Sequence, residues 1–76
     1  MEKKYKFLEN FCQGMLAKST VYNLCMEENP VIVDIYKFIK KNKYKNLYIK
    51  LSFDAKSIYI CERRGNGNYI LKDYDI

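Results

Sequence analysis

The chain has 76 residues, of which 14 are basic, 9 are acidic and none is histidine, so its formal net charge is +5. This length allows one domain, residues 1–76, and no apolar stretch approaches the ~18 residues that a membrane span needs. Because 49% of the residues are apolar and 16% are aromatic, we expect a soluble folded core rather than a disordered chain, with a charge that attracts polyanions.

A helix over residues 4–16 is the first predicted element. Its apolar side chains recur at spacings of three, four and one, at Tyr5, Leu8, Phe11, Cys12, Met15 and Leu16. Gly14 costs about 1 kcal/mol relative to Ala inside a helix, so we expect the helix to fray or end there. Ser19 or Thr20 then caps a short second helix ending near residues 27–29. Its core residues are Val21, Leu24 and Cys25.

The third predicted helix has the clearest boundaries. Asn29 is a good N-cap, and Pro30 follows at the first helical position, where its missing N–H is not needed. The apolar stripe consists of Val31 or Ile32, then Ile35, Tyr36 and Ile39. Asp34 lies early in the helix and Lys37, Lys40 and Lys41 lie late, which suits the helix dipole. We expect the helix to end near Asn42.

After this helix the apolar period changes from helical to alternating. Leu47, Ile49, Leu51 and Phe53 alternate with polar or aromatic residues, which predicts a half-buried strand. Residues 54–56 make a tight turn into a second strand over 57–64, with Ile58 and Ile60 facing inward. The run 65–68 (Gly-Asn-Gly-Asn) predicts a hairpin with a type I′ turn, followed by a short strand over 69–71.

These elements predict an α+β fold in which two to three N-terminal helices precede a three-stranded antiparallel β-meander, the element order of a winged helix. The small strand that usually separates the first two helices of that architecture is absent from the pattern. The predicted core consists of Leu8, Phe11, Leu24, Ile35, Ile39, Leu47, Ile49, Leu51, Ile58 and Ile60.

The three cysteines, Cys12, Cys25 and Cys61, fit neither a disulfide framework nor the spacing of zinc ligands. Cys12 and Cys25 are expected to be small buried apolar residues. Small secreted domains are usually rich in cysteine, and no signal-peptide pattern follows the first residues, so we expect a cytoplasmic protein without metal or cofactor. Abundant Lys, Asn, Ile and Tyr indicate an AT-rich genome, such as that of a phage or other mobile element.

The sequence offers no catalytic constellation. It has no histidine, no glycine-rich phosphate loop and no activated nucleophile. Asp54, Asp73 and Asp75 fall in predicted loop or tail positions, and Glu62 is the one acid on a predicted strand. Metal-dependent nuclease chemistry would need several converging carboxylates, so we predict that the protein is not an enzyme.

Basic residues are concentrated in two places, the end of the third helix and the hairpin tip. No acid occurs between residues 36 and 52, a stretch that contains six lysines. The candidate contacts to nucleic acid or to an acidic partner are Lys37, Lys40, Lys41, Lys43, Lys45, Arg63, Arg64, Asn66 and Asn68. The helical lysines follow an apolar first half, Val31 to Val33, which suits phosphate contact better than base reading. A solvated helix end is the alternative interpretation.

The far face of the sheet is a further candidate surface. Alternation places five side chains together there: Tyr48, Lys50, Tyr59, Arg63 and Tyr69. Aromatic and basic residues on a sheet stack unpaired bases in some proteins and form protein-binding hot spots in others. The strand propensity of tyrosine alone also explains this composition.

Three short runs, Ser19–Leu24, Asn29-Pro30 and Ile35–Ile39, together resemble the second half of a repressor-type helix-turn-helix domain. In that family a recognition helix with an S-T-x-x-x-[IL] pattern precedes an N-P turn and a core helix. The strand at residues 47–51 also resembles the dimerising strand of some antitoxin-type regulators. The resemblance covers about residues 18–51, and it implies that the second helix contacts DNA through Lys18, Ser19, Thr20 and Asn23.

The sequence therefore favours a small basic binding protein associated with nucleic acid, such as a DNA-binding regulator, and a homodimer is compatible with this role. The alternative is a phage-type inhibitor, of the anti-CRISPR or anti-defence kind, that binds a host nucleoprotein effector. An RNA-acting toxin is a third hypothesis, for which the chain offers no acid–base pair.

Overall fold

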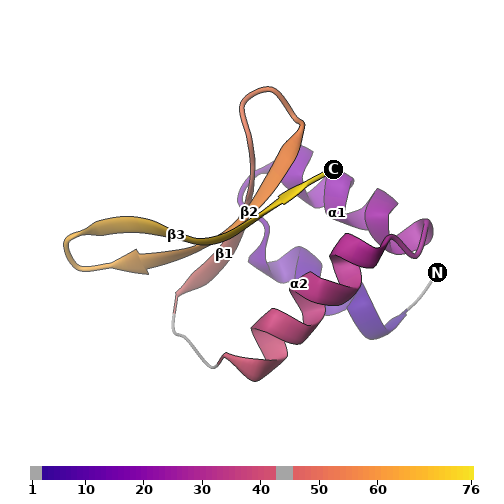
Figure 1. The fold of residues 1–76 in the computed structure, drawn as a ribbon, viewed down its shortest axis with the longest axis horizontal. Helices are drawn as coiled ribbons and strands as arrows, with labels where there is room; N and C mark the ends of the chain where they lie inside the picture. The colour runs from indigo at the N-terminus through magenta and orange to yellow at the C-terminus, as the bar shows by residue number, and fades with distance from the viewer. Residues whose placement is uncertain (1–2, 43–45) are drawn as a thin grey trace.

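The computed structural model describes residues 3–42 and 46–76, in which helices precede strands (Figure 1). Its elements are a 3-10 helix, two α-helices and three strands: η1 (Lys3–Phe11), α1 (Met15–Met26), α2 (Pro30–Lys41), β1 (Leu47–Leu51), β2 (Ser57–Arg64) and β3 (Gly67–Asp75). The strands form one antiparallel sheet in the order β1-β2-β3, which confirms the predicted α+β meander. No helix of the described residues has both the length and the apolar character to cross a membrane.

The N-terminal region departs from the prediction, because the first helix ends earlier than expected. Helix η1 ends at Phe11, and Cys12 then forms a parallel bridge with β1. Gly14 has a φ of 91°, a conformation that favours glycine, and α1 begins directly after it. The expected break at Gly14 is thus present, but the placement of Met15 and Leu16 on the apolar face of the first helix is wrong, because both side chains lie exposed at the start of α1.

Helix α1 also begins earlier than predicted. Gly14 occupies its N-cap position without a side-chain hydrogen bond, so the predicted caps, Ser19 and Thr20, lie inside the helix. The hydroxyl group of Thr20 donates a hydrogen bond to the carbonyl oxygen of Leu16 at 2.9 Å. The predicted core residues of this helix are buried, and Ala17 joins them in the stripe Ala17, Val21, Leu24 and Cys25.

Helix α2 begins and ends as predicted. The side chain of Asn29 accepts a hydrogen bond from the N–H of Val31 at 2.9 Å, and Pro30 occupies the first helical position. Asn42 is the C-cap. The helix packs on the core through Ile32 and Ile35, which are fully buried.

The strands differ from the prediction at two ends. Strand β1 stops at Leu51, so Phe53 lies exposed in the turn rather than on the strand as predicted. Strand β3 is longer than the predicted segment 69–71, because it pairs with the whole of β2, as far as Ser57 opposite Asp75. Asp73 and Asp75 therefore belong to a strand and not to a tail.

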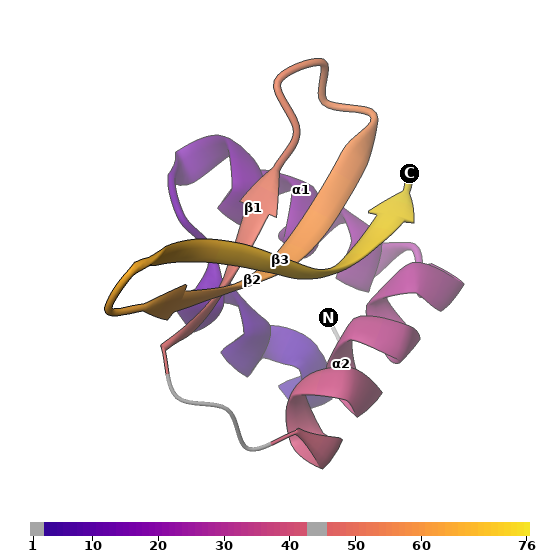
Figure 2. The same cartoon turned by 60° about the vertical axis from the view of Figure 1, so that its left-hand side comes forward.

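The β2–β3 hairpin is confirmed at the predicted place, but its turn type is not. Gly65 and Asn66 form the loop between the paired residues Arg64 and Gly67. A type I′ turn needs a positive φ at both loop residues, whereas the positive φ of 144° falls on Gly67. Further along the hairpin the register shifts between Ile60 and Cys61, which is a bulge that increases the local twist (Figure 2).

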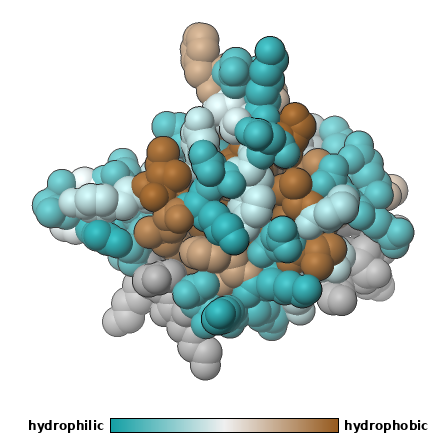
Figure 3. Space-filling model, in the orientation of Figure 1, coloured by the Kyte–Doolittle hydropathy of each residue, from teal (hydrophilic) through white to brown (hydrophobic). Residues whose placement is uncertain are grey.

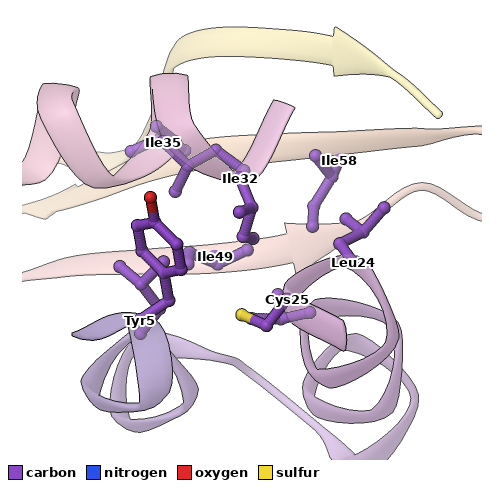
Figure 4. Packing of buried hydrophobic residues seen from close by; sticks show 10 residues of the cluster. Tyr5, Leu24, Cys25, Ile32, Ile35, Ile49 and Ile58 are labelled. Carbon is purple, nitrogen blue, oxygen red and sulfur yellow. The ribbon is translucent and has the colours of Figure 1, made fainter. Parts of the chain in front are cut away.

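The hydrophobic core lies between the helices and one face of the sheet (Figure 2). Figure 4 shows side chains from the two layers pointing toward one another, among them Tyr5, Leu24, Cys25, Ile32, Ile35, Ile49 and Ile58. Six predicted core residues are buried: Leu8, Leu24, Ile35, Ile49, Ile58 and Ile60. The other four are half-buried: Phe11, Ile39, Leu47 and Leu51. Buried residues absent from the predicted core include Tyr5, Ala17, Tyr48 and Cys61.

Candidate functional site

Three lysines from two elements line a groove between α2 and β3. Lys37 and Lys41 are four residues apart on α2 and therefore lie on one side of the helix, while Lys72 comes from β3. The groove has a volume of about 450 Å³, and its other lining residues are Asp34, Phe38 and Asn42. Three ammonium groups accompany one carboxylate, which leaves this site positively charged. We call it the basic groove.

Lys72 was absent from the predicted contacts, because the third strand was expected to end before it. In the structure Lys72 pairs with Ile60, which places it on the face of the sheet that carries the helices. Its ammonium group lies 5.4 Å from the ring centroid of Tyr74 and 5.8 Å from that of Phe38. These cation–π contacts hold the charge at the edge of the groove. Lys72 and Tyr74 are two residues apart and share one face of the sheet, a spacing that indicated a longer strand. The bulge at Leu71 interrupts this alternation before Lys72.

Only part of the predicted basic run reaches this groove. The ammonium group of Lys40 lies 5.6 Å from the ring centroid of Phe7 and 5.8 Å from that of Tyr36, on another side of α2. Lys43 and Lys45 lie outside the described residues. The structure therefore brings together two of the five predicted lysines, Lys37 and Lys41.

The hairpin tip is a second basic site that projects from the body of the molecule (Figure 1). The guanidinium group of Arg63 lies over the Tyr48 ring, with 4.7 Å between its central carbon and the ring centroid. Arg64 lies 4.2 Å from the ring centroid of Tyr69, and its Nε donates a hydrogen bond to Glu62 at 2.7 Å. Asn66 and Asn68 are exposed beyond these pairs. Each arginine therefore lies over a tyrosine ring, and each arginine–tyrosine pair forms a flat surface.

The expected row of side chains on the far face of the sheet is interrupted. Tyr69 pairs with Glu62, which pairs with Leu47, so Tyr69 lies on the opposite face from Tyr48 and Tyr59. The prediction that it joins them is wrong, because the hairpin turn pairs Arg64 with Gly67 and so sets Tyr69 opposite Glu62. Tyr48 is itself buried beside Cys61, and this burial raises the pKa of its hydroxyl group.

The other four predicted residues, Tyr48, Lys50, Tyr59 and Arg63, share that face. Lys50 and Tyr59 form a cross-strand pair there, in which Lys50 is exposed and Tyr59 is half-buried. Tyr48 is buried beneath Arg63 and Tyr59 is half-buried, so the two rings do not form an open platform on which successive bases could stack. The described side chains therefore favour the groove and the hairpin tip over the sheet face as contact sites.

The residues implied by the helix-turn-helix resemblance lie on α1. Lys18, Ser19 and Asn23 are exposed, whereas Thr20 is half-buried and its hydroxyl group is used by the helix itself. Between them α1 exposes large apolar side chains: Met15, Leu16, Tyr22 and Met26. Figure 3 shows one face of the whole molecule, on which hydrophilic side chains surround separate hydrophobic patches.

The thiol groups are poorly suited to nucleophilic chemistry at neutral pH. Burial, with a smaller contribution from Glu9, raises the pKa of Cys12 to about 12. Burial also raises the pKa values of Cys25 and Cys61, both of which are buried as free cysteines. Thiolates and not thiols attack electrophiles, so burial disfavours the nucleophilic form of all three groups. Within residues 3–42 and 46–76, no three Cys, Asp or Glu residues are grouped so that they could hold a metal ion.

Comparison with known proteins gives no relative: no family model, no curated protein and no solved structure matches the chain.

Proposed function

We propose that this protein is a non-catalytic binding protein whose basic groove contacts the phosphate backbone of nucleic acid. The observation that carries the proposal is the convergence of Lys37, Lys41 and Lys72 from two elements with a single carboxylate among them. A nucleic acid is a polyanion with regularly spaced phosphates, and several lysines placed together release its condensed counterions on binding. The three free thiols suit a reducing cytoplasm, where such a partner occurs.

The groove suits sequence-independent contact. Lysine is a compact charge on a flexible stem, which binds phosphate without the fixed fork geometry that reads guanine. The groove lies at the C-terminal half of α2. Val31 and Val33, near the start of this helix, pack partly against the core. In this binding mode α2 contacts the phosphate backbone of the nucleic acid and does not contact the bases.

The helix-turn-helix resemblance supports a different docking mode, through α1. That helix offers Lys18, Ser19 and Asn23 at its surface, with one positive charge and no acid. The basic groove presents three positive charges, so affinity for the backbone is concentrated at α2. We therefore place the primary contact at the groove.

A charge-matched pair of variants tests this proposal. The first variant changes Lys37, Lys41 and Lys72 to Gln, and the control changes three exposed lysines elsewhere, Lys6, Lys50 and Lys56, to Gln. Binding of a fluorescent DNA duplex is measured over a salt series. The groove variant should lower the slope of log K against log salt by roughly three, because each phosphate contact contributes about 0.9. The control should change this slope by less than about 0.9, the contribution of one phosphate contact.

Two results decide the outcome. The proposal is supported if the groove variant weakens binding to unrelated duplex sequences by the same factor. It is contradicted if the groove variant and the control lose the same affinity, because then only the net charge matters.

A second candidate function is a protein-directed inhibitor that occupies a nucleoprotein effector. The pairs Arg63–Tyr48 and Arg64–Tyr69 favour it, because arginine and tyrosine dominate hot spots at protein interfaces. Such an inhibitor would bind an acidic protein surface and not free duplex. Changing both arginines to Glu would then slow association with the protein partner, whereas DNA binding would be negligible before and after the change.

A further inference from the structure

One acidic side chain lies among the lysines of the basic groove. Asp34 comes three residues before Lys37 and seven before Lys41, so the three side chains share one side of α2. The carboxylate of Asp34 is exposed, and within residues 3–42 and 46–76 it makes neither a hydrogen bond nor an ion pair. The groove therefore contains a negative charge that no lysine neutralises by direct contact.

The position of Asp34 along α2 does not account for this carboxylate. Acids stabilise the first turn of a helix, where they face the positive end of the dipole, and the effect fades within that turn. Asp34 is the fifth residue of α2, which begins at Pro30, and the first turn contains no acid. In a site for a polyanion, such a carboxylate weakens the binding of phosphate unless it contacts another group of the ligand.

The neighbouring side chain of Tyr74 has an unused hydrogen-bond donor. Tyr74 follows Lys72 by two residues on the same face of β3, and its buried hydroxyl group has no hydrogen-bond partner in the described part of the chain. Burial raises the pKa of this hydroxyl group, and the negative charge of Asp34 raises it further, which places the two groups near each other. Buried polar groups are normally paired, so a further polar group is needed at this edge of the groove.

The backbone of a nucleic acid offers Asp34 very few donors. Phosphate groups present only acceptors at neutral pH, and deoxyribose within a strand has no hydroxyl group. The ribose of RNA has a 2′-hydroxyl group, which is the sole hydrogen-bond donor along a sugar–phosphate backbone and can also accept a bond. A carboxylate among phosphate-binding lysines therefore matches the backbone of RNA and has no counterpart in that of DNA.

We propose that the basic groove prefers RNA to DNA, with Asp34 accepting a hydrogen bond from a ribose 2′-hydroxyl group while the three lysines contact the flanking phosphates. At a rise of about 1.5 Å per residue, the stems of Lys37 and Lys41 are roughly 6 Å apart along α2, so they can contact phosphates that follow one another along a strand. The lysines attract both polymers, and the carboxylate favours one of them. This inference rests on the proposed function, because it concerns the same groove.

Two strands that differ only at the 2′ position test the preference. A uridine strand of about ten nucleotides, within the usual site sizes, is compared with the deoxyuridine strand of equal length by fluorescence anisotropy. The uridine strand should bind about tenfold more tightly, the size expected for one hydrogen bond to a charged group. Both strands carry the same phosphates, so the preference should persist across a salt series. A strand with fluorine in place of the 2′-hydroxyl group keeps the RNA-like sugar conformation without the donor, and it should bind like the deoxyuridine strand.

A variant of Asp34 and a matched control separate a direct contact from an effect of charge. Asp34→Ala removes the acceptor and should bring the affinities for the two strands within about twofold of each other. Asp73→Ala removes the same charge from the face of β3 opposite to Lys72, and it should retain the preference of the wild type. Both positions are exposed, and circular dichroism checks that each variant is folded.

The outcomes distinguish this inference from the proposed function. Equal binding of the uridine and deoxyuridine strands, weakened in both by the lysine variant of the groove, overturns the RNA preference alone. An Asp34→Ala variant that tightens both strands by the same factor also overturns it, because Asp34 then acts only through its charge. So does a fluorine-substituted strand that binds as tightly as the uridine strand. If the wild-type chain binds neither strand, the proposed function fails and the inference fails with it.

Discussion

Helices α1 and α2 are each 12 residues long and each buries one stripe, but their outer faces have opposite chemistry. The outer face of α2 carries Asp34 and three lysines, whereas α1 exposes four large apolar side chains and a single charge, Lys18. A helix with a charged outer face is satisfied by water, while a helix that is apolar on both sides usually has a second contact. This difference places the proposed polyanion contact at α2 and not at α1.

The largest expected effect separates the two sides of α1. Leu24 is 7% exposed and Leu16 is 77% exposed, so the same substitution tests burial at both. Leu24→Ala should lower the free energy of unfolding by about 2–5 kcal/mol, because it opens a cavity in the core. Leu16→Ala should change it by less than about 0.5 kcal/mol. Urea denaturation of the monomer measures both, and equal losses would show that the outer face of α1 is already buried within the chain.

A smaller effect concerns how the two helices begin. Helix α2 has a side-chain cap in Asn29, whereas α1 has none. Asn29→Ala should cost about 1 kcal/mol, since the N–H of Val31 loses its acceptor. For a domain of this size this corresponds to a fall in Tm of roughly 4–8 °C. Asn29→Asp keeps an acceptor oxygen and should retain most of the stability. A loss in the Asp variant as large as in the Ala variant would argue against the cap.

The smallest expected effect concerns the turn that presents Phe53. The hydrogen bond from the Ser52 hydroxyl group, with that from the Lys56 N–H, lowers the pKa of Asp54. A lowered pKa in the folded state means that ionised Asp54 stabilises the turn at neutral pH. This contribution is lost as the pH falls through that lowered value. Asp54 is fully exposed, so the effect on overall stability should be slight.

Carbon-detected NMR titration of the Asp54 carboxyl group measures this shift directly. The midpoint should lie below the usual aspartate range, and Ser52→Ala should move it upward, because the Ser52 hydroxyl group is the largest cause. A wild-type midpoint equal to that of the urea-unfolded chain would show that the turn is open in solution.

The sequence predicted best where a few adjacent residues decide the local structure. Asn29 and Pro30 specify the start of α2, and the alternation over residues 57–64 specifies β2, so both boundaries are confirmed. Gly14 was recognised as a helix breaker, but the pattern did not reveal that α1 starts immediately after it. With a positive φ at Gly14, α1 starts about one and a half turns before the predicted caps, and Met15 and Leu16 lie on its outside.

Features that depend on pairing between distant segments were not predicted. The register shift at Ile60 and Cys61 carries Lys72 to the helix side, and no local pattern marks it. The pairing of Arg64 with Gly67 at the hairpin turn places Tyr69 on the opposite face from Tyr48. Phe53 continues the apolar alternation of β1, but the hydrogen bonds of the turn end the strand before it. The charge that defines the basic groove was thus only partly visible in the sequence, through Lys37 and Lys41.

The most direct test of the account is a map of where nucleic acid touches the chain. Amide proton–nitrogen NMR spectra are recorded while a short duplex of arbitrary sequence is added at low salt. The account predicts that the resonances of Lys37, Asn42 and Lys72 shift together, while those of Ser19 and Asn23 stay in place. Shifts confined to α1, with the residues of the basic groove unchanged, would contradict it and would favour docking through the helix-turn-helix surface.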